Sequence, residues 1–105
     1  MDINKIYWHD GNLIDTCYTI SEEGKSKLVL NAYLYESSKA SERTKYRLIC
    51  SGIRRINFGI DAIELKNNAF AGNMSNGYLK KNTLWLYFSD GVLEVVAKKF
   101  NVEPC

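Results

Sequence analysis

The single histidine of the chain, His9, lies beside Asp10 in the run Tyr7-Trp8-His9-Asp10-Gly11. An aspartate that orients an imidazole could support general-base chemistry. Neighbouring side chains on an extended strand point to opposite faces, however, so adjacency in sequence is weak support for a dyad. We therefore interpret His9 as a structural or surface residue, and we expect no catalytic residue and no enzymatic activity.

The sequence also contains no motif that predicts metal binding, redox chemistry or phosphate binding. The three cysteines, Cys17, Cys50 and Cys105, are odd in number and lack Cys-x-x-Cys spacing. No arrangement of the histidine, cysteines and carboxylates fits a zinc or calcium site. The run from Gly72 to Gly77 lacks the Lys-Ser/Thr ending of a phosphate-binding loop. We predict no metal and no cofactor, and we interpret the thiols as idle or buried thiols of a reducing cytoplasm.

Aromatic residues are the strongest candidates for binding. Trp85 and Tyr87 occupy the face of a predicted hairpin opposite its apolar face, and Tyr33 and Tyr35 do the same upstream. Large aromatic side chains with polar tips act as anchors in protein interfaces. The alternative, that another part of the same domain covers them, stays open at this point.

Basic residues leave room for a different partner. Arg43, Lys45 and Arg47 alternate along one predicted strand, and further lysines and arginines are spread over the C-terminal two thirds. Such a surface could bind nucleic acid, with the aromatic residues as stacking platforms. A formal net charge of +2 is low for such a domain, and alternating basic residues also protect strand edges. An RNA-binding module is therefore the alternative function, behind a protein partner.

The clearest structural element is a hairpin near the C-terminus. The run 84–88 and the run 92–97 both alternate, and Asp90-Gly91 between them is a strong signal for a type I′ turn. With Asp90 and Gly91 at the turn positions, Phe88 lies opposite Leu93. Leu86 then lies opposite Val95 and Leu84 opposite Ala97. Every pair is apolar and all lie on one face, so pattern and turn chemistry agree.

A second hairpin is predicted upstream. The loop Glu22-Glu23-Gly24, with Gly24 in the left-handed conformation, places Tyr18 opposite Leu28 and Ile14 opposite Ala32. Strands are also expected at Arg43–Ile49, at Ile53–Phe58 beyond Gly52, and at Tyr78–Lys80 after a turn at Asn76-Gly77. Asp61 could cap a short helix from Ala62 to about Asn67.

These elements predict one domain, residues 1–105, that is mainly β. We expect an antiparallel sandwich or half-barrel of six or seven strands with one short helix at most. The first ten residues lack the apolar run of a secretory signal, and no window is apolar enough for a membrane helix. A cytoplasmic protein without membrane contact is the expectation.

Three stretches carry a resemblance to a known group of proteins. They are Trp8-His9-Asp10 with Leu13-Ile14; Gly72-Asn73-Met74 with Gly77-Tyr78; and the run from Leu84 through Asp90-Gly91 to Val95, ending in Ala97-Lys98-Lys99-Phe100. Together they resemble small β-rich immunity proteins of bacterial contact-dependent growth inhibition and related polymorphic toxin systems. The resemblance spans nearly the whole chain, although its motifs are short.

The resemblance implies a cytoplasmic protein that binds the C-terminal domain of one cognate toxin, often a nuclease, and neutralises it. Inhibitors of nucleases commonly present carboxylates to the phosphate-binding surface of the enzyme. Residues 1–36 carry six acids and three bases, against six acids and eleven bases in residues 37–105. Charge therefore indicates carboxylates as partner-binding candidates beside the four aromatic residues: Glu22, Glu23, Glu36, Asp61 and Glu64.

Overall fold

Six antiparallel strands form one strongly curled sheet in the order β1-β2-β3-β6-β5-β4, which confirms the mainly β prediction. The computed structural model describes residues 3–61, 63 and 73–105. The elements are a 3-10 helix η1 (Ile3–Lys5) and the strands β1 (Tyr7–Ile20), β2 (Ser26–Tyr35), β3 (Thr44–Ile60), β4 (Met74–Lys80), β5 (Thr83–Phe88) and β6 (Gly91–Pro104).

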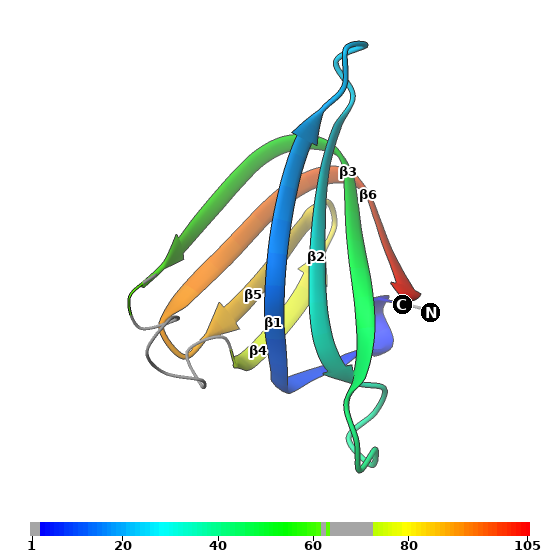
Figure 1. Ribbon diagram of the computed structural model, residues 1–105, viewed down its shortest axis with the longest axis vertical. Coiled ribbons are helices and arrows are strands. Elements are labelled where there is room, and N and C mark those ends of the chain that lie inside the picture. Colours follow the sequence, from blue (N-terminus) through cyan, green and yellow to red (C-terminus); the bar gives the residue numbers. More distant parts are fainter. Residues whose placement is uncertain (1–2, 62, 64–72) are drawn as a thin grey trace.

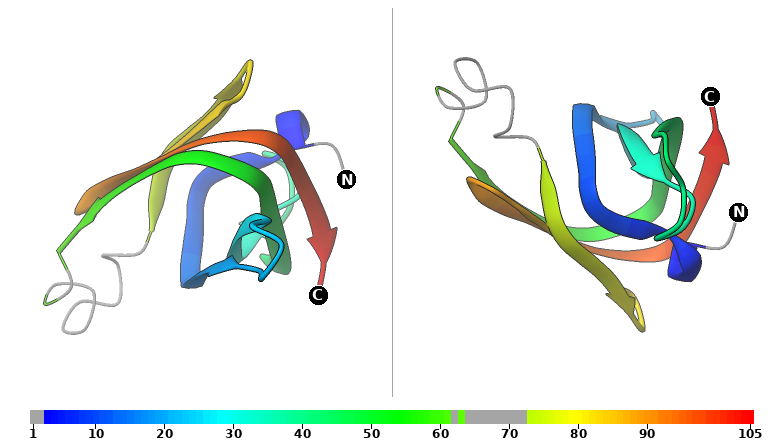
Figure 2. Two further views of the ribbon diagram at one scale, coloured as in Figure 1. Left: turned by 90° about the horizontal axis from the view of Figure 1, so that it is seen from above. Right: turned by 90° about the horizontal axis from the view of Figure 1, so that it is seen from below.

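The two longest neighbours in the sheet, β3 and β6, bend and so belong to two layers (Figures 1 and 2). The first half of β3 and the last half of β6 lie in the layer of β1 and β2. The last half of β3 and the first half of β6 lie in the layer of β4 and β5. Gly52 sits at the bend with φ 66°, and the register shifts between Ile53 and Arg55. Glycine at positive φ and bulges are the usual devices for turning such a corner. The predicted strands on either side of Gly52 are thus one strand.

The C-terminal hairpin forms, but its register differs by two residues from the prediction. Leu86 lies opposite Leu93 and Phe88 opposite Gly91, so Ser89 and Asp90 make the turn. Neither Asp90 nor Gly91 has positive φ, as a type I′ turn would require. A side chain on Gly91 would collide with the Gly59 backbone of β3. Close approach of two strands, and not the turn, therefore explains this glycine.

A shift of two residues preserves the face of every side chain, so the predicted apolar face is correct. Leu84, Leu86 and Phe88 of β5 and Leu93, Val95 and Ala97 of β6 are all buried. They meet an equally buried row on β2 and β3, formed by Leu28, Leu30, Ala32, Leu34, Tyr46, Leu48 and Cys50. The core thus fills the inside of the curl, between the two layers.

The upstream hairpin follows its prediction near the turn. Tyr18 lies opposite Leu28, and Gly24 has φ 79° beyond the Glu22-Glu23 turn. Further along, an irregularity between Leu13 and Asp15 places Leu13, not Ile14, opposite Ala32. The predicted pairing of Ile14 is therefore wrong, because Ile14 is the additional residue of a bulge and is left exposed.

The first half of β1 closes one side of the curl against β4, the strand at the other edge of the sheet. Asn12 forms an isolated bridge with Asn73, and the Trp8 ring packs on Gly77. A Cβ on Gly77 would lie 2.8 Å from both Trp8 and Leu86. The predicted turn at Asn76-Gly77 is wrong, since both residues lie inside β4 and Gly77 makes room for the indole. We call this contact the closed side.

At the end of β3 the structure bears on one further prediction. Asp61 Oδ1 accepts a hydrogen bond from the Ile63 amide at 3.0 Å, which is the contact expected of a capping aspartate. Apart from Ile63, the predicted helix from Ala62 to Asn67 lies outside the described residues. Within residues 3–61, 63 and 73–105, no helix is long and apolar enough to span a membrane.

Candidate protein-binding surface

Three aromatic side chains form a ladder on the outer face of the second layer: Tyr78 of β4 with Trp85 and Tyr87 of β5. Tyr78 and Trp85 are cross-strand partners, and their rings lie 5.0 Å apart between centroids. The Tyr78 and Tyr87 rings are stacked with centroids 6.0 Å apart. The two tyrosine hydroxyl oxygens are 3.3 Å apart, within hydrogen-bonding distance. We call these three residues the aromatic ladder.

One carboxylate anchors the ladder from β6. Glu94 lies opposite Trp85, and its Oε2 accepts a hydrogen bond from the indole Nε1 at 3.0 Å. Its Oε1 accepts a second bond from the Arg55 guanidinium at 3.3 Å. Glu94 thereby fixes the orientation of the indole and keeps its own charge partly compensated.

The ladder combines exposure with order. Tyr78 is 45% exposed, and Trp85 and Tyr87 are half-buried. The hydrogen bond with Tyr78 is the main reason that the pKa of Tyr87 is raised, and burial and the Glu94 charge add to it. Aromatic side chains held in one geometry before binding lose little entropy when a partner arrives. This arrangement suits an interface anchor.

The structure brings together Trp85 and Tyr87 but separates them from the other two predicted aromatics. Tyr33 and Tyr35 lie on β2, and β3 and β6 stand between that strand and β5. Tyr33 is exposed, whereas the Arg43 guanidinium lies 5.6 Å from the centroid of the half-buried Tyr35 ring. The predicted aromatic surface is therefore two patches on different layers.

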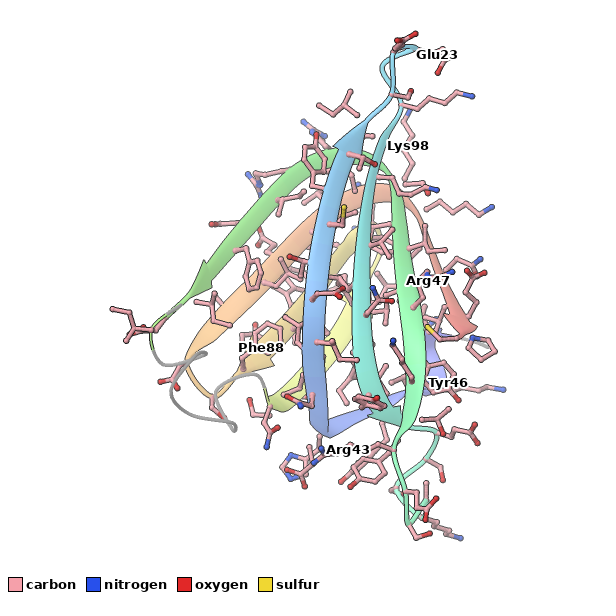
Figure 3. All side chains as sticks on the ribbon, viewed as in Figure 1. Glu23, Arg43, Tyr46, Arg47, Phe88 and Lys98 are labelled. Atoms are coloured by element: carbon pink, nitrogen blue, oxygen red, sulfur yellow. The ribbon has the colours of Figure 1, made fainter. Side chains whose placement is uncertain are left out.

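The predicted carboxylates do not gather on one surface. Glu22 and Glu23 occupy the tip of the β1–β2 hairpin, at the opposite end of the molecule from Arg43 (Figure 3). Asp61 follows the end of β3, and Glu64 lies outside the described residues. Glu36 accepts a hydrogen bond from the Tyr46 hydroxyl at 2.6 Å, and burial and this carboxylate raise the pKa of Tyr46 to about 12. The contact gives Glu36 a structural role.

Sequence reasoning missed Tyr78 and Glu94 as members of this surface. Tyr78 fell at the start of a strand expected to be short, because Asn76-Gly77 was interpreted as a turn. Glu94 was expected opposite Tyr87, and the register difference of two residues moves it to Trp85. The alternation of outer-face residues on three adjacent strands was the signal that could have found both.

The basic residues of the first layer point outward, as predicted, and are partly neutralised. Arg47 forms an ion pair with Glu103 of the neighbouring strand at 3.1 Å, on an exposed face. Lys45 lies opposite Tyr33 on the same outer face. Such exposed pairs contribute little to stability, and they reduce the positive charge that a phosphate backbone would meet.

His9 and Asp10 come closer than strand alternation allows, because Asp10 has φ 63°. His9 Nε2 lies 3.5 Å from an Asp10 carboxylate oxygen, and His9 Nδ1 lies 3.1 Å from the Ser75 carbonyl oxygen. Both side chains are more than half exposed, so water competes for each contact. The contact of His9 with the Ser75 carbonyl oxygen joins β1 to β4. A backbone carbonyl is not a nucleophile, so His9 has no group here that it could activate as a general base.

Among the described residues, no group of three or more histidine, cysteine, aspartate or glutamate side chains could hold a metal ion. Comparison with known proteins adds nothing to this geometry: no family model, no curated protein and no solved structure matches the chain.

Proposed function

We propose that the protein binds another protein through the aromatic ladder, and that this partner is the toxin domain which the resemblance to immunity proteins implies. The observation that carries the proposal is the ladder itself, in which the exposed Tyr78 and the half-buried Trp85 and Tyr87 are held by mutual contacts and by Glu94. Binding would neutralise the toxin in the cytoplasm by covering its active site or its approach to substrate.

Energetics favour a protein partner for this surface. A few aromatic anchors supply most of the affinity of a typical interface. Val92, which is 38% exposed opposite Tyr87, extends the apolar part of the surface, and the tyrosine hydroxyls offer polar contacts beside it. Such a mixture of apolar area and polar tips matches the core of an interface.

The RNA-binding alternative is less well supported at the same place. Stacking on aromatic rings is also how single-stranded nucleic acid binds, but a phosphate backbone needs cations nearby. The charged group in hydrogen-bonding contact with the ladder is the Glu94 carboxylate, and the adjacent Arg55 is already paired with it. A partner that presents protein donors to Glu94 fits better than one that presents phosphates.

The decisive test searches for a toxin domain encoded immediately upstream and expresses that domain with this protein and with variants; absence of such a domain would count against the immunity proposal. We expect rescue of growth and co-purification of the pair, and we expect Trp85→Ala and Tyr78→Ala to lower affinity at least about tenfold. Tyr33→Ala is the matched control, because Tyr33 has a similar exposure on the other layer. Absence of rescue by the unmodified protein would overturn the immunity proposal.

A salt series separates the two partner classes. Binding to a 20-nucleotide single-stranded RNA should weaken steeply with salt, whereas an aromatic-anchored protein complex should change little. Tight RNA binding that Trp85→Ala abolishes would assign the ladder to nucleic acid instead.

A further inference from the structure

One arm of β3 has an edge with which no other described strand pairs. β2 begins at Ser26, and its pairing with β3 stops at Lys27, opposite Ser51. Beyond Ser51, β6 is the described strand that pairs with β3. Ser26 Oγ closes the junction, because it accepts a hydrogen bond from the Ile53 amide at 2.7 Å and lies 3.5 Å from the Ile53 carbonyl. From Arg54 to Ile60, no strand of the described residues pairs with the outer side of β3. Half of the backbone groups of this arm therefore point away from β6, to a strand position that no described strand occupies.

An apolar groove runs along this edge. It has a volume of about 450 Å³, with Thr16 and Tyr18 of β1 on one side and Ile56 and Phe58 of β3 on the other. A larger hollow of about 1080 Å³ also has Ile53 and Arg54 in its lining. The β1 and β3 arms diverge here, as Figure 1 shows. We call this groove the open side.

The open side exposes residues whose counterparts elsewhere on the inner face are buried. Tyr18 is 49% exposed, Ile20 63% and Phe58 36%, although Leu28, opposite Tyr18, is only 4% exposed. An apolar patch of this kind beside an unpaired strand edge is the surface to which an extended peptide adds as a further strand.

The charged residues around the two hollows indicate the composition of such a peptide. Four basic residues border the two hollows without an ion pair to any described residue, and a fifth, Arg55, is paired with Glu94. Glu23 is the single acid on these walls. The unpaired four are Lys25, Lys27, Arg54 and Lys98.

We propose that the edge of β3 from Arg54 to Ile60 binds an extended, acidic peptide segment of another protein by strand addition. Alternate apolar side chains of the peptide enter the groove between Tyr18 and Phe58, and its acidic residues meet Arg54 and the neighbouring lysines. The groove is lined by none of the three ladder residues, and Arg55, which lines it, reaches the ladder through Glu94. The inference does not depend on the proposed function.

Two other occupants fit the observations less well. A second copy of this chain, paired edge to edge, would bring two Arg54 side chains and two basic borders together. Single-stranded RNA would satisfy the charge but would leave the backbone groups of β3 unpaired and would meet an apolar floor.

The test is selection of a displayed library of random twelve-residue peptides on the full-length protein. We expect enriched sequences that alternate apolar residues and carry acids. Their synthetic forms should lose at least about tenfold in affinity against Tyr18→Ser and against Arg54→Glu. Tyr33→Ser, an exposed tyrosine on the outer face of β2, should leave binding unchanged. Alternate amides of the bound peptide should point toward β3, because a strand pairs through one edge. N-methylation of these amides should abolish binding, whereas N-methylation of the amides between them should leave binding unchanged.

Several results would overturn the inference. One is a failure to enrich any peptide. Another is an unchanged affinity of the enriched peptides for the Tyr18→Ser and Arg54→Glu variants. A concentration-dependent dimer that Tyr18→Ser disrupts would identify a second copy as the occupant. Binding of a 20-nucleotide RNA that competes with the peptides and weakens steeply with salt would point to nucleic acid.

Discussion

The closed side and the open side of the curled sheet begin from the same kind of sequence and end differently. Along β1, Trp8 and Leu13 are buried and Trp8 packs on Gly77 of β4, whereas Tyr18 and Ile20 of the same strand are exposed. Both halves carry apolar residues on the inner face. The difference is that the first half of β1 meets the edge of β4 across the curl, whereas the second half meets no strand edge of the described residues. Burial therefore depends on closure of the sheet, which an alternating pattern does not encode.

The largest difference between the two sides should appear on truncation of Trp8. Trp8 is 6% exposed and packs on Gly77, so Trp8→Ala would leave a cavity where β1 meets β4. We expect a loss of about 3–5 kcal/mol in the free energy of unfolding, measured by urea denaturation. Tyr7→Ala, at the exposed neighbouring position, is the control and should cost about 1 kcal/mol or less. Equal effects of the two would contradict the described closure.

Gly91 tests whether the exposed arm of β3 is nevertheless tightly joined to β6. A Cβ at Gly91 would collide with the Gly59 backbone, whereas a Cβ at Gly59 would meet nothing within 4 Å. We expect Gly91→Ala to destabilise the protein by about 1–3 kcal/mol in thermal or urea unfolding, because the strands must separate. Gly59→Ala should be neutral or slightly stabilising. Tolerance of both substitutions would show that the arm is loosely packed.

Alkaline pH probes the buried inner face through Cys50. Burial raises the pKa of the Cys50 thiol to about 12 from its ordinary 9.0. Because the raised pKa belongs to the folded state, the stabilisation is complete below pH 9 and is lost as pH rises towards 12. Between pH 9 and pH 10 we expect a loss on the order of 1 kcal/mol in the free energy of unfolding.

Cys50→Ala should reduce this slope, although it lowers stability at every pH by removing buried volume. Cys17→Ala, at an exposed thiol, should keep the slope. The comparison is best limited to pH 8–10, since the pKa of Tyr46 is also raised to about 12 and its effect grows above pH 10. A flat profile for the unmodified protein would contradict the burial of the Cys50 thiol.

The smallest effect is expected on the open side. Tyr18 is half exposed and belongs to an edge strand, so Tyr18→Ser should change the free energy of unfolding by about 0.5 kcal/mol or less. The same substitution should weaken the peptide binding proposed above. A large loss of stability from Tyr18→Ser would show that Tyr18 is part of the core, and the groove would then be no binding surface.

The alternating pattern predicted the faces of the strands well. Every residue expected on the apolar face of the C-terminal hairpin is buried. The registers of the strand pairs were predicted less well. Asp90-Gly91 and Asn76-Gly77 are typical turn sequences, yet Gly91 and Gly77 serve close packing against Gly59 and Trp8. A glycine needed for space and a glycine needed for conformation are indistinguishable without the partner that approaches it.

For the candidate surface, the sequence identified Trp85 and Tyr87 but could not assemble the ladder. Tyr78 joins them only because β4 pairs with β5 at that register, and Glu94 joins through the true pairing of β6. The carboxylates predicted from charge alone lie apart, because charge counts along the chain carry no information about which strand ends meet.

The bend of β3 and β6 also bears on how the chain acquires its structure. This ribbon pairs Ile60 with Gly91 at one end and Tyr46 with Pro104 at the other, enclosing β4 and β5. It contributes strands to both layers, so loss of the ribbon would leave each layer with only two of its strands. Contacts so distant in sequence are slow to form. Folding should thus be a slow, single cooperative transition in which neither layer persists without the other.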